Sequence, residues 1–82
     1  MQVIVYGTET CVQCNATKRK LRERGVAYWS VDLADDRHAS KLAQLKRELG
    51  DPLQLPVVKV FTAPGTQTDV WQGYNPGKLN AL

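Results

Sequence analysis

Two cysteines, Cys11 and Cys14, are the residues of this 82-residue chain best suited to covalent chemistry. They enclose Val12 and Gln13 in a Cys-Val-Gln-Cys run that follows a small, polar stretch at residues 7–10. A disulfide between them would close a loop of about four residues, for which chain entropy gives roughly 2 kcal/mol, against about 4.7 kcal/mol for a 100-residue loop. Because a structural cross-link would be badly placed there, we interpret the pair as reactive in reversible thiol–disulfide exchange.

The position of the pair suggests separate roles for the two thiols, because the run is expected to follow a strand and to open a helix. A thiol at a helix N-terminus faces unpaired N–H groups and the positive end of the helix dipole, which favour the thiolate. In such motifs the pKa of a cysteine falls to between about 3.5 and 7.5. Positions i and i+3 share a helix face, within disulfide reach. We expect Cys11 to attack a target disulfide and the more buried Cys14 to resolve the mixed disulfide.

A zinc site is the main alternative use of the two cysteines. Structural zinc normally takes four Cys or His ligands, whereas this chain offers two cysteines and His38, which lies far from them in sequence and is expected at the surface. We therefore expect no metal, and no cofactor other than a redox-active disulfide between Cys11 and Cys14. A fold used for interaction or metal binding, without exchange activity, stays open as a second hypothesis.

The hydrophobic pattern predicts the element order β-α-β-α-β-β-α. The expected strands are Gln2–Tyr6, Val26–Leu33, Val57–Phe61 and Thr68–Trp71. The expected helices are Cys11–Arg24, a second from Asp35 or Asp36 to Leu49, and Pro76–Leu82. The first two strands flank a helix, which predicts a parallel pair joined by a right-handed crossover.

Local signals set the expected ends of these elements. Thr10 or Thr8 is expected to cap the first helix, and Gly25 to end it. The second helix is expected to present one apolar face and to end at Gly50 and Pro52. The residues of that face are Ala39, Leu42, Leu45 and Leu49. The segment 63–65 reads as a hairpin turn.

Composition and charge indicate a single soluble domain over residues 1–82. The chain is 43% hydrophobic and 23% charged, close to globular averages, and it has neither a targeting segment nor an apolar stretch of membrane-spanning length. We therefore expect a cytoplasmic monomer without membrane contact. Its net charge of +3 comes largely from a cluster at residues 18–24, which we interpret as a solvated basic face. No aromatic residue interleaves that cluster, so we expect no nucleic-acid partner.

Three runs resemble the NrdH-redoxins, glutaredoxin-like proteins of the thioredoxin superfamily, and the resemblance covers nearly the whole chain. The runs are Cys-Val-Gln-Cys-Asn-Ala-Thr-Lys-Arg from Cys11, Leu-Pro-Val-Val from Leu55, and Trp-Gln-Gly-Tyr-Asn-Pro from Trp71. The resemblance implies an α/β fold of the thioredoxin/glutaredoxin type, with a four-stranded mixed sheet flanked by three helices. It also implies a dithiol–disulfide oxidoreductase that takes electrons from thioredoxin reductase and reduces a class Ib ribonucleotide reductase or another protein disulfide.

The same resemblance assigns the site residues. It makes Cys11 the nucleophile, Cys14 the resolving thiol and Pro56 a cis-proline, beside which backbone groups are free to pair with a target peptide. The residues expected to bind partners are Val12, Gln13, Leu55, Pro56, Trp71, Gly73 and Tyr74. Trp71 and Tyr74 are expected to flank the disulfide as an apolar docking patch, although aromatic residues at a hairpin end also suit a core. Trp29 is expected to lie in the core or to cover the sheet.

Departures from family patterns bear on the reductant. Glutaredoxins usually hold glutathione with a basic residue before the first cysteine and an acidic pair at the start of the last helix. Here Thr8 and Glu9 precede the motif and Asn75-Pro76-Gly77 replaces the acidic pair, so a glutathione-dependent glutaredoxin is the less favoured alternative. The chain also departs from the usual NrdH pattern at residues 71–77. It is longer at residues 61–69, which predicts an extended hairpin near the docking surface.

Overall fold

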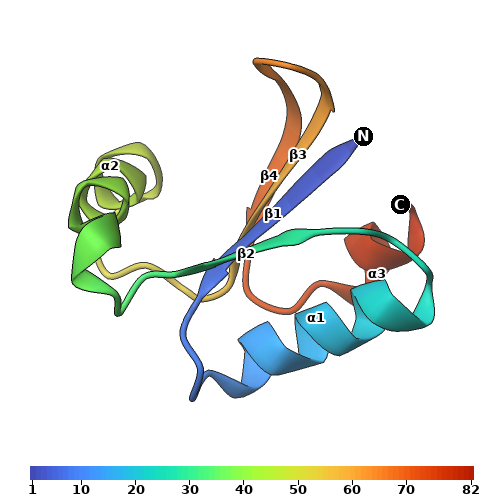
Figure 1. Cartoon of the computed structure of the whole chain (residues 1–82), viewed down its shortest axis with the longest axis horizontal. Coiled ribbons are helices and arrows are strands. Elements are labelled where there is room, and N and C mark those ends of the chain that lie inside the picture. The colour runs from blue at the N-terminus through green and yellow to red at the C-terminus, as the bar shows by residue number, and fades with distance from the viewer.

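Four strands form one mixed sheet in the computed structural model, which describes residues 1–82 (Figure 1). The strands are β1 (Gln2–Gly7), β2 (Trp29–Asp32), β3 (Val57–Ala63) and β4 (Thr66–Gln72). Their order across the sheet is β2-β1-β3-β4, with β1 parallel to β2 and antiparallel to β3, and with β4 antiparallel to β3. The predicted parallel pair and the predicted β-α-β-α-β-β-α order are confirmed.

Helices cover both faces of this sheet. They are α1 (Val12–Glu23), α2 (Ala39–Leu49) after a short 3-10 turn η1 (Asp36–His38), and α3 (Pro76–Asn80). In Figure 1, α1 and α3 lie on one side of the sheet and α2 lies on the other. Alternation along β1 sends Val3 and Val5 to the core beside Leu21 of α1, and Tyr6 to the core beside Leu45 of α2. The thioredoxin-like fold class is therefore confirmed.

The start of α1 differs from the prediction. Neither Thr10 nor Thr8 caps the helix; the N-cap is Cys11, in an extended conformation, and its sulfur accepts the N–H of Cys14. The Cys11 sulfur thus takes the place that a hydroxyl oxygen has in an ordinary cap. The predicted end is confirmed, because Gly25 follows the C-cap with a left-handed φ of 69°.

The start of the second helix also differs from the prediction. Asp35 caps η1 through the N–H of Arg37, and the α-helix begins only at Ala39, which is exposed and takes no part in the apolar face. Leu45 is fully buried, with Leu42 and Leu49 packed beside it. The face therefore has three members instead of four.

The second strand is shorter than predicted, since only residues from Trp29 to Asp32 pair with β1. β2 lies at an edge of the sheet, and Trp29 is 65% exposed there. The expectation that Trp29 lies in the core or covers the sheet is wrong. Its neighbour Tyr28 packs against the core instead.

The β3–β4 hairpin is extended, as predicted, with both strands longer than the expected Val57–Phe61 and Thr68–Trp71, but it points away from the cysteines. Tyr6, beside the motif, pairs with Val57, whereas Gln2 at the other end of β1 pairs with Phe61. The hairpin tip beyond Phe61 therefore extends from the opposite end of the sheet, as the upper part of Figure 1 shows. The expectation that the extra residues lie near the docking surface is wrong.

The three α-helices are short. None combines the length and the apolar character that a crossing of the bilayer requires.

Candidate active site

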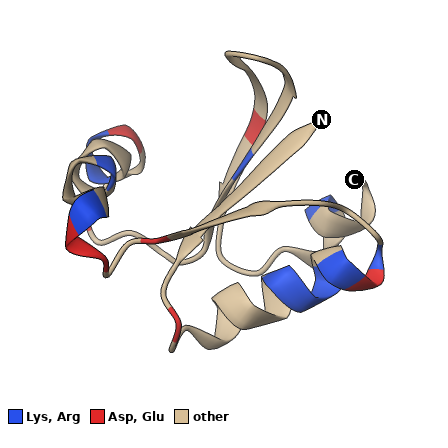
Figure 2. Cartoon of the chain, in the orientation of Figure 1, with Lys and Arg blue, Asp and Glu red and all other residues tan.

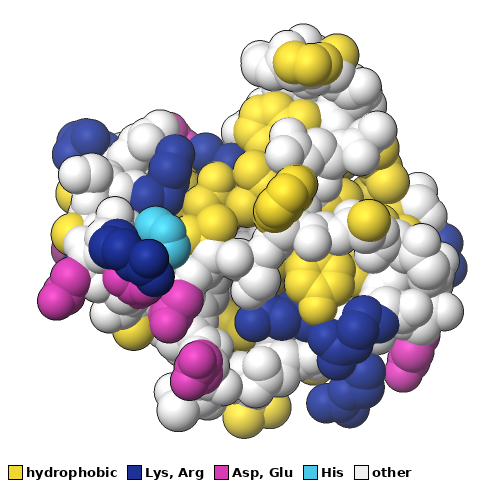
Figure 3. All heavy atoms as spheres, in the orientation of Figure 1, with side chains coloured by type: hydrophobic (Ala, Val, Ile, Leu, Met, Phe, Trp, Pro, Cys, Tyr) yellow, Lys and Arg dark blue, Asp and Glu magenta, His cyan; other side chains and the backbone are white.

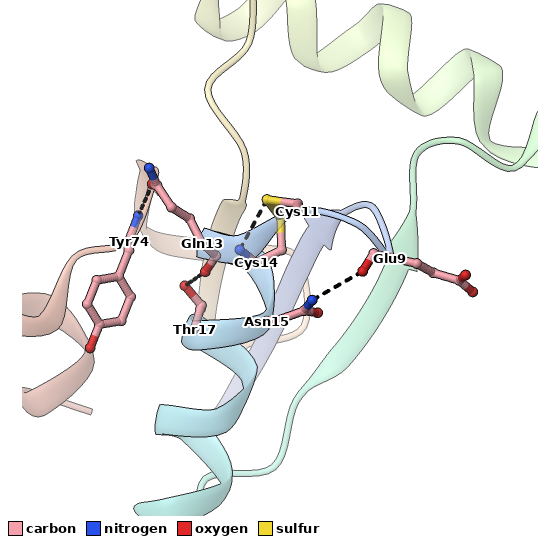
Figure 4. The surroundings of a disulfide bond; sticks show 7 residues. All are labelled: Glu9, Cys11, Gln13, Cys14, Asn15, Thr17 and Tyr74. Atoms are coloured by element: carbon pink, nitrogen blue, oxygen red, sulfur yellow. Dashed lines mark hydrogen bonds between the residues drawn. A yellow bond between two sulfur atoms is a disulfide. The ribbon is translucent and has the colours of Figure 1, made fainter.

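The two cysteines form a disulfide where α1 begins, with their Cα atoms 5.2 Å apart (Figure 4). Cys11 is half-buried, whereas Cys14 is fully buried, with no exposed surface. The backbone N–H of Cys14 donates to the Cys11 sulfur at 3.1 Å. Of the two sulfur atoms, that of Cys11 is the one a partner can reach.

Gly7, at the end of β1, makes room for the buried cysteine. A Cβ atom at this position would overlap the Cys14 sulfur and would lie 3.0 Å from the Cys14 Cβ. The sequence alone shows Gly7 only as part of the small, polar stretch at residues 7–10. The available signal was a glycine directly after an apolar strand and just before the reactive run, a place where another group approaches the backbone closely.

The Leu55–Pro56 bond is cis, as the resemblance implied. Pro56 is buried, and its carbonyl accepts the N–H of Gly73 at 2.8 Å. Leu55, just before it, is half-buried, and its own backbone N–H and C=O make no hydrogen bond within the chain. A second cis bond, Asp51–Pro52, lies earlier in the same loop.

A hydrogen bond joins α1 to the loop that follows β4. The Gln13 side-chain oxygen accepts the N–H of Tyr74 at 2.9 Å, as Figure 4 shows. Gly73, the residue before Tyr74, has a φ of 79°. A Cβ at this position would lie 3.2 Å from the Gln13 side-chain oxygen and 2.8 Å from the Gln54 side-chain nitrogen. Only glycine fits this position without strain. The structure thus brings Gln13, Gly73 and Tyr74 together with Pro56.

Two further glutamines belong to the same network and were missed by sequence reasoning. The N–H of Gln54 donates to the side-chain oxygen of Gln72 at 2.9 Å, which connects the cis-proline loop to the end of β4. In the sequence, only their positions close to Pro56 and Gly73 indicate a role for these two glutamines. A polar side chain in a loop does not reveal its hydrogen-bond partner.

The two predicted docking aromatics do not flank the disulfide. Trp71 is 7% exposed and belongs to the core with Val58 and Leu79, so its assignment to an exposed docking patch is wrong. Strand alternation explains this, because Trp71 pairs with Val58, whose side chain faces α1 and α3. Tyr74 is 41% exposed, but in Figure 4 its ring points away from the two sulfur atoms.

The exposed apolar surface beside the cysteines is formed by other residues. Val12, adjacent to Cys11, is 80% exposed. On the α2 side of the site lies a groove of about 310 Å³, whose apolar walls include Leu42, Leu53 and Leu55, with Thr8 at the cysteine side. A groove of this size and polarity accepts one or two side chains of a partner.

The ion pairs of the chain lie away from the cysteines. They are Asp35–Arg37 at 2.7 Å, Glu48–Lys59 at 3.0 Å and Asp69–Lys78 at 2.8 Å. In each pair, hydrogen bonds from the basic side chain hold the pKa of the carboxyl group below its usual value. Burial raises the pKa of the Tyr6 phenol, and the nearby Glu48 charge adds to the shift.

The nearest acidic residue before the motif is Glu9. Its carboxylate points away from the sulfur atoms in Figure 4, while its backbone carbonyl accepts the side-chain amide of Asn15 at 3.1 Å. No three His, Cys, Asp or Glu side chains gather anywhere in the structure, and His38 instead lies 2.8 Å from the carbonyl of Asp32. The cysteines therefore lack the further ligands of a structural zinc site.

Comparison with known proteins finds relatives among the glutaredoxins and glutaredoxin-like proteins. Residues 3–62 match the glutaredoxin family model. The chain is 34% identical over 84 residues to the glutaredoxin-like protein NrdH of Salmonella typhimurium LT2, covering all of this chain and 89% of the relative. It is 34% identical over 82 residues to the NrdH protein of Escherichia coli K12, with the same coverage.

Solved structures agree in fold. The NrdH-redoxin of Escherichia coli superposes with a TM-score of 0.74 and 28% identity, covering all of this chain and 95% of that one. A glutaredoxin from Archaeoglobus fulgidus superposes with a TM-score of 0.73, covering 98% of this chain and 83% of that one. At 24% identity, the second likeness concerns the fold alone.

Proposed function

This chain belongs to the glutaredoxin family, as an NrdH-like thiol–disulfide oxidoreductase, and on that premise we propose that it carries electrons from thioredoxin reductase to a protein disulfide, that of a class Ib ribonucleotide reductase. The observation that carries the exchange chemistry is the unequal burial of the two cysteines at the start of α1. The reachable sulfur belongs to Cys11, and the screened one to Cys14.

The proposed cycle starts with both cysteines reduced. The Cys11 thiolate attacks one sulfur of the target disulfide, which releases the first target thiolate and leaves Cys11 in a mixed disulfide with the target. The Cys14 thiolate then attacks the Cys11 sulfur, releases the second target thiolate and closes the Cys11–Cys14 disulfide. Two electrons pass to the target, and the two thiols of the redoxin give up their protons.

Backbone groups beside the cysteines support the binding of an extended target segment. The free N–H and C=O of Leu55 are available to pair with the target backbone, while Pro56 is held by Gly73. The apolar groove beside Leu55 offers room for a target side chain. Main-chain pairing supplies affinity without demanding one sequence, which suits a redoxin that meets both a reductase and a target.

Three features favour a protein reductant over glutathione. The segment before the motif, Thr8 and Glu9, brings no cation to hold a glutathione carboxylate. At the start of α3, Asn75 uses its side chain to accept the N–H of Lys78, and no acidic pair is present there to hold the glutathione amine. The NrdH-redoxin of Escherichia coli has a thioredoxin-like activity profile. We further propose that the protein works as a monomer in the cytoplasm, where thiols stay reduced, without nucleic-acid or membrane partners.

An NADPH-coupled assay tests the proposed electron donor. The protein is supplied either with thioredoxin reductase or with glutathione and glutathione reductase, and the reduction of a protein disulfide is followed by NADPH consumption. We expect turnover with thioredoxin reductase and little with glutathione. The reverse pattern would assign the chain to the glutathione-dependent glutaredoxins. Cys11→Ser serves as the control and should abolish turnover in both arms.

A further inference from the structure

The second half of α1 carries a concentration of positive charge that the exchange chemistry does not use. Five of its seven residues from position 18 are basic, and we call them the α1 basic patch: Lys18, Arg19, Lys20, Arg22 and Arg24. With Glu23, this segment has a charge of +4, while the other six basic and seven acidic residues leave the rest of the chain at −1. The net charge of the protein therefore resides on one half of one helix (Figure 2).

No Asp or Glu side chain forms an ion pair with the patch, since none of the three ion pairs includes any of its members. Arg22 donates to the Tyr28 hydroxyl at 2.8 Å, and Arg24 donates to a main-chain oxygen of Leu82 at 2.9 Å. Figure 3 shows dark-blue side chains gathered on the surface over this part of the molecule, with only one magenta group beside them.

The fold does not explain the whole cluster. Basic residues in the last turn, such as Lys20 and Arg22, suit the negative end of the helix dipole. However, Lys18 and Arg22 are four residues apart, as are Lys20 and Arg24, and like charges at this spacing destabilise a helix. The repulsion between these like charges offsets part of the stabilisation from the dipole, so helix stability alone does not explain five basic residues in this segment.

The patch lies on the same helix as the reactive sulfur. Asn15 and Arg19 follow Cys11 at steps of four residues and are both exposed, so they lie along one face of α1. At a rise of 1.5 Å per residue, Arg19 is about 12 Å from Cys11 along the helix axis. An extended peptide covers that distance in about four residues.

We propose that the α1 basic patch binds an acidic segment of the protein whose disulfide Cys11 attacks, with acidic residues about three to six positions from the target cysteine. This inference rests on the proposed function, in which the target is a protein disulfide. The patch raises the rate of productive encounter by steering the partner towards Cys11. Continuity with the reactive cysteine favours a protein partner over a nucleic acid, since Arg19 lies on the same face of α1 as Cys11 and a target disulfide must reach Cys11.

Model peptides test the proposal without any reductase. Each peptide is a disulfide-linked dimer with one cysteine, flanked three to six positions away by Asp, by Asn or by Lys. The protein is reduced chemically beforehand, and the second-order rate of peptide reduction is measured at low and high salt. Each turnover converts one peptide disulfide to two thiols and the two protein thiols to the Cys11–Cys14 disulfide.

The expected rates follow from the charges. For wild type at low salt we expect the Asp peptide to react about tenfold faster than the Asn peptide, at the lower end of electrostatic rate enhancements, and 0.5 M salt should remove the difference. Arg19→Glu lowers the patch from +4 to +2. Because the logarithm of the enhancement scales with the charge product, the ratio should fall to about threefold. Arg47→Glu, an equal change at an exposed residue of α2, should leave it near tenfold.

Three results would overturn the proposal. One is equal rates for the Asp and Asn peptides, and another is equal effects of Arg19→Glu and Arg47→Glu, which would reflect net charge alone. The third is an Arg19→Glu change that weakens binding of a single-stranded oligonucleotide while leaving peptide selectivity intact, which would assign the patch to nucleic acid. Failure of the proposed function would give a different result. A protein that is not reduced by thioredoxin reductase would still reduce these peptides after chemical reduction, so the effect of peptide charge could still be measured.

Discussion

Gly7→Ala is the perturbation that most specifically probes the packing of the buried cysteine. The added methyl group overlaps the Cys14 sulfur and lies 3.0 Å from the Cys14 Cβ. The φ of Gly7 is not positive, so alanine meets no backbone strain and the effect is one of contact alone. In the oxidised protein the Cys14 sulfur is held by its bond to Cys11, whereas in the reduced protein the thiol is free to turn to another rotamer.

The magnitude follows from this difference between the two redox states. Forcing an extra methyl group into a packed core costs typically about 1–3 kcal/mol. If the reduced thiol escapes the overlap, this cost falls on the oxidised form alone and makes the disulfide easier to reduce. At 30 mV per 1.4 kcal/mol, the reduction potential should rise by roughly 20 to 60 mV.

Two independent measurements test this predicted shift in reduction potential. Urea unfolding of the oxidised and the chemically reduced forms gives the loss of stability in each, and equilibration with a redox buffer gives the potential. The difference between the two losses should equal the shift in potential. The control is Gly77→Ala in α3, where the nearest atom to the added Cβ is at 3.5 Å; it should be neutral or stabilising by up to about 1 kcal/mol, with no change in potential. Equal destabilisation of both forms by Gly7→Ala, with an unchanged potential, would refute the argument.

Further predictions concern the loop contact and one ion pair. Gln13→Ala removes the acceptor of the Tyr74 N–H. Because such a hydrogen bond is worth about 1 kcal/mol, we expect the KM for a protein disulfide to rise roughly fivefold. The rate on a small disulfide should stay unchanged. A similar loss on both substrates would contradict this positional role. Glu48→Gln leaves the buried ammonium of Lys59 without its charged partner and should cost about 1–2 kcal/mol in urea unfolding, a value reduced from that of a fully buried pair because Glu48 is 40% exposed. Asp69→Asn, whose lysine partner is itself exposed, should cost less than about 1 kcal/mol, and the reverse ranking would argue against burial as the cause. Because Lys59 lowers the pKa of Glu48 in the folded state, the stabilisation is present above the unfolded pKa of about 4.3 and is lost as the pH falls through the folded value. The stability difference between wild type and Glu48→Gln should therefore shrink steadily below about pH 4, and a difference that persists in acid would contradict the assignment.

The fold was predictable because local and long-range signals agree along most of the chain. The β-branched and aromatic run of β1, the helical spacing in α1 and the glycine at position 25 all point to the observed elements. The errors lie where tertiary packing decides. The exposure of Trp29 depends on β2 being a sheet edge, and the delayed start of α2 depends on Asp35 capping a 3-10 turn first.

The site was predictable at the cysteines and the cis-proline, where short motifs carry a direct chemical or conformational meaning. It was not predictable where a role depends on which segment lies opposite. Trp71 lies in the core because of its register with Val58, and Gly7 is required because Cys14 packs against it. Register and cross-chain contacts of this kind are set by the whole fold and leave little trace in the local sequence.

Trapping the mixed disulfide tests the division of labour between Cys11 and Cys14 most directly. Cys14→Ser removes the resolving thiol, so incubation with a peptide disulfide and digestion under non-reducing conditions should yield one peptide adduct, located on Cys11 by mass spectrometry. The matched Cys11→Ser variant keeps only the fully buried thiol and should form almost no adduct. An adduct that forms equally well on Cys14, or wild-type activity retained by Cys11→Ser, would contradict the account.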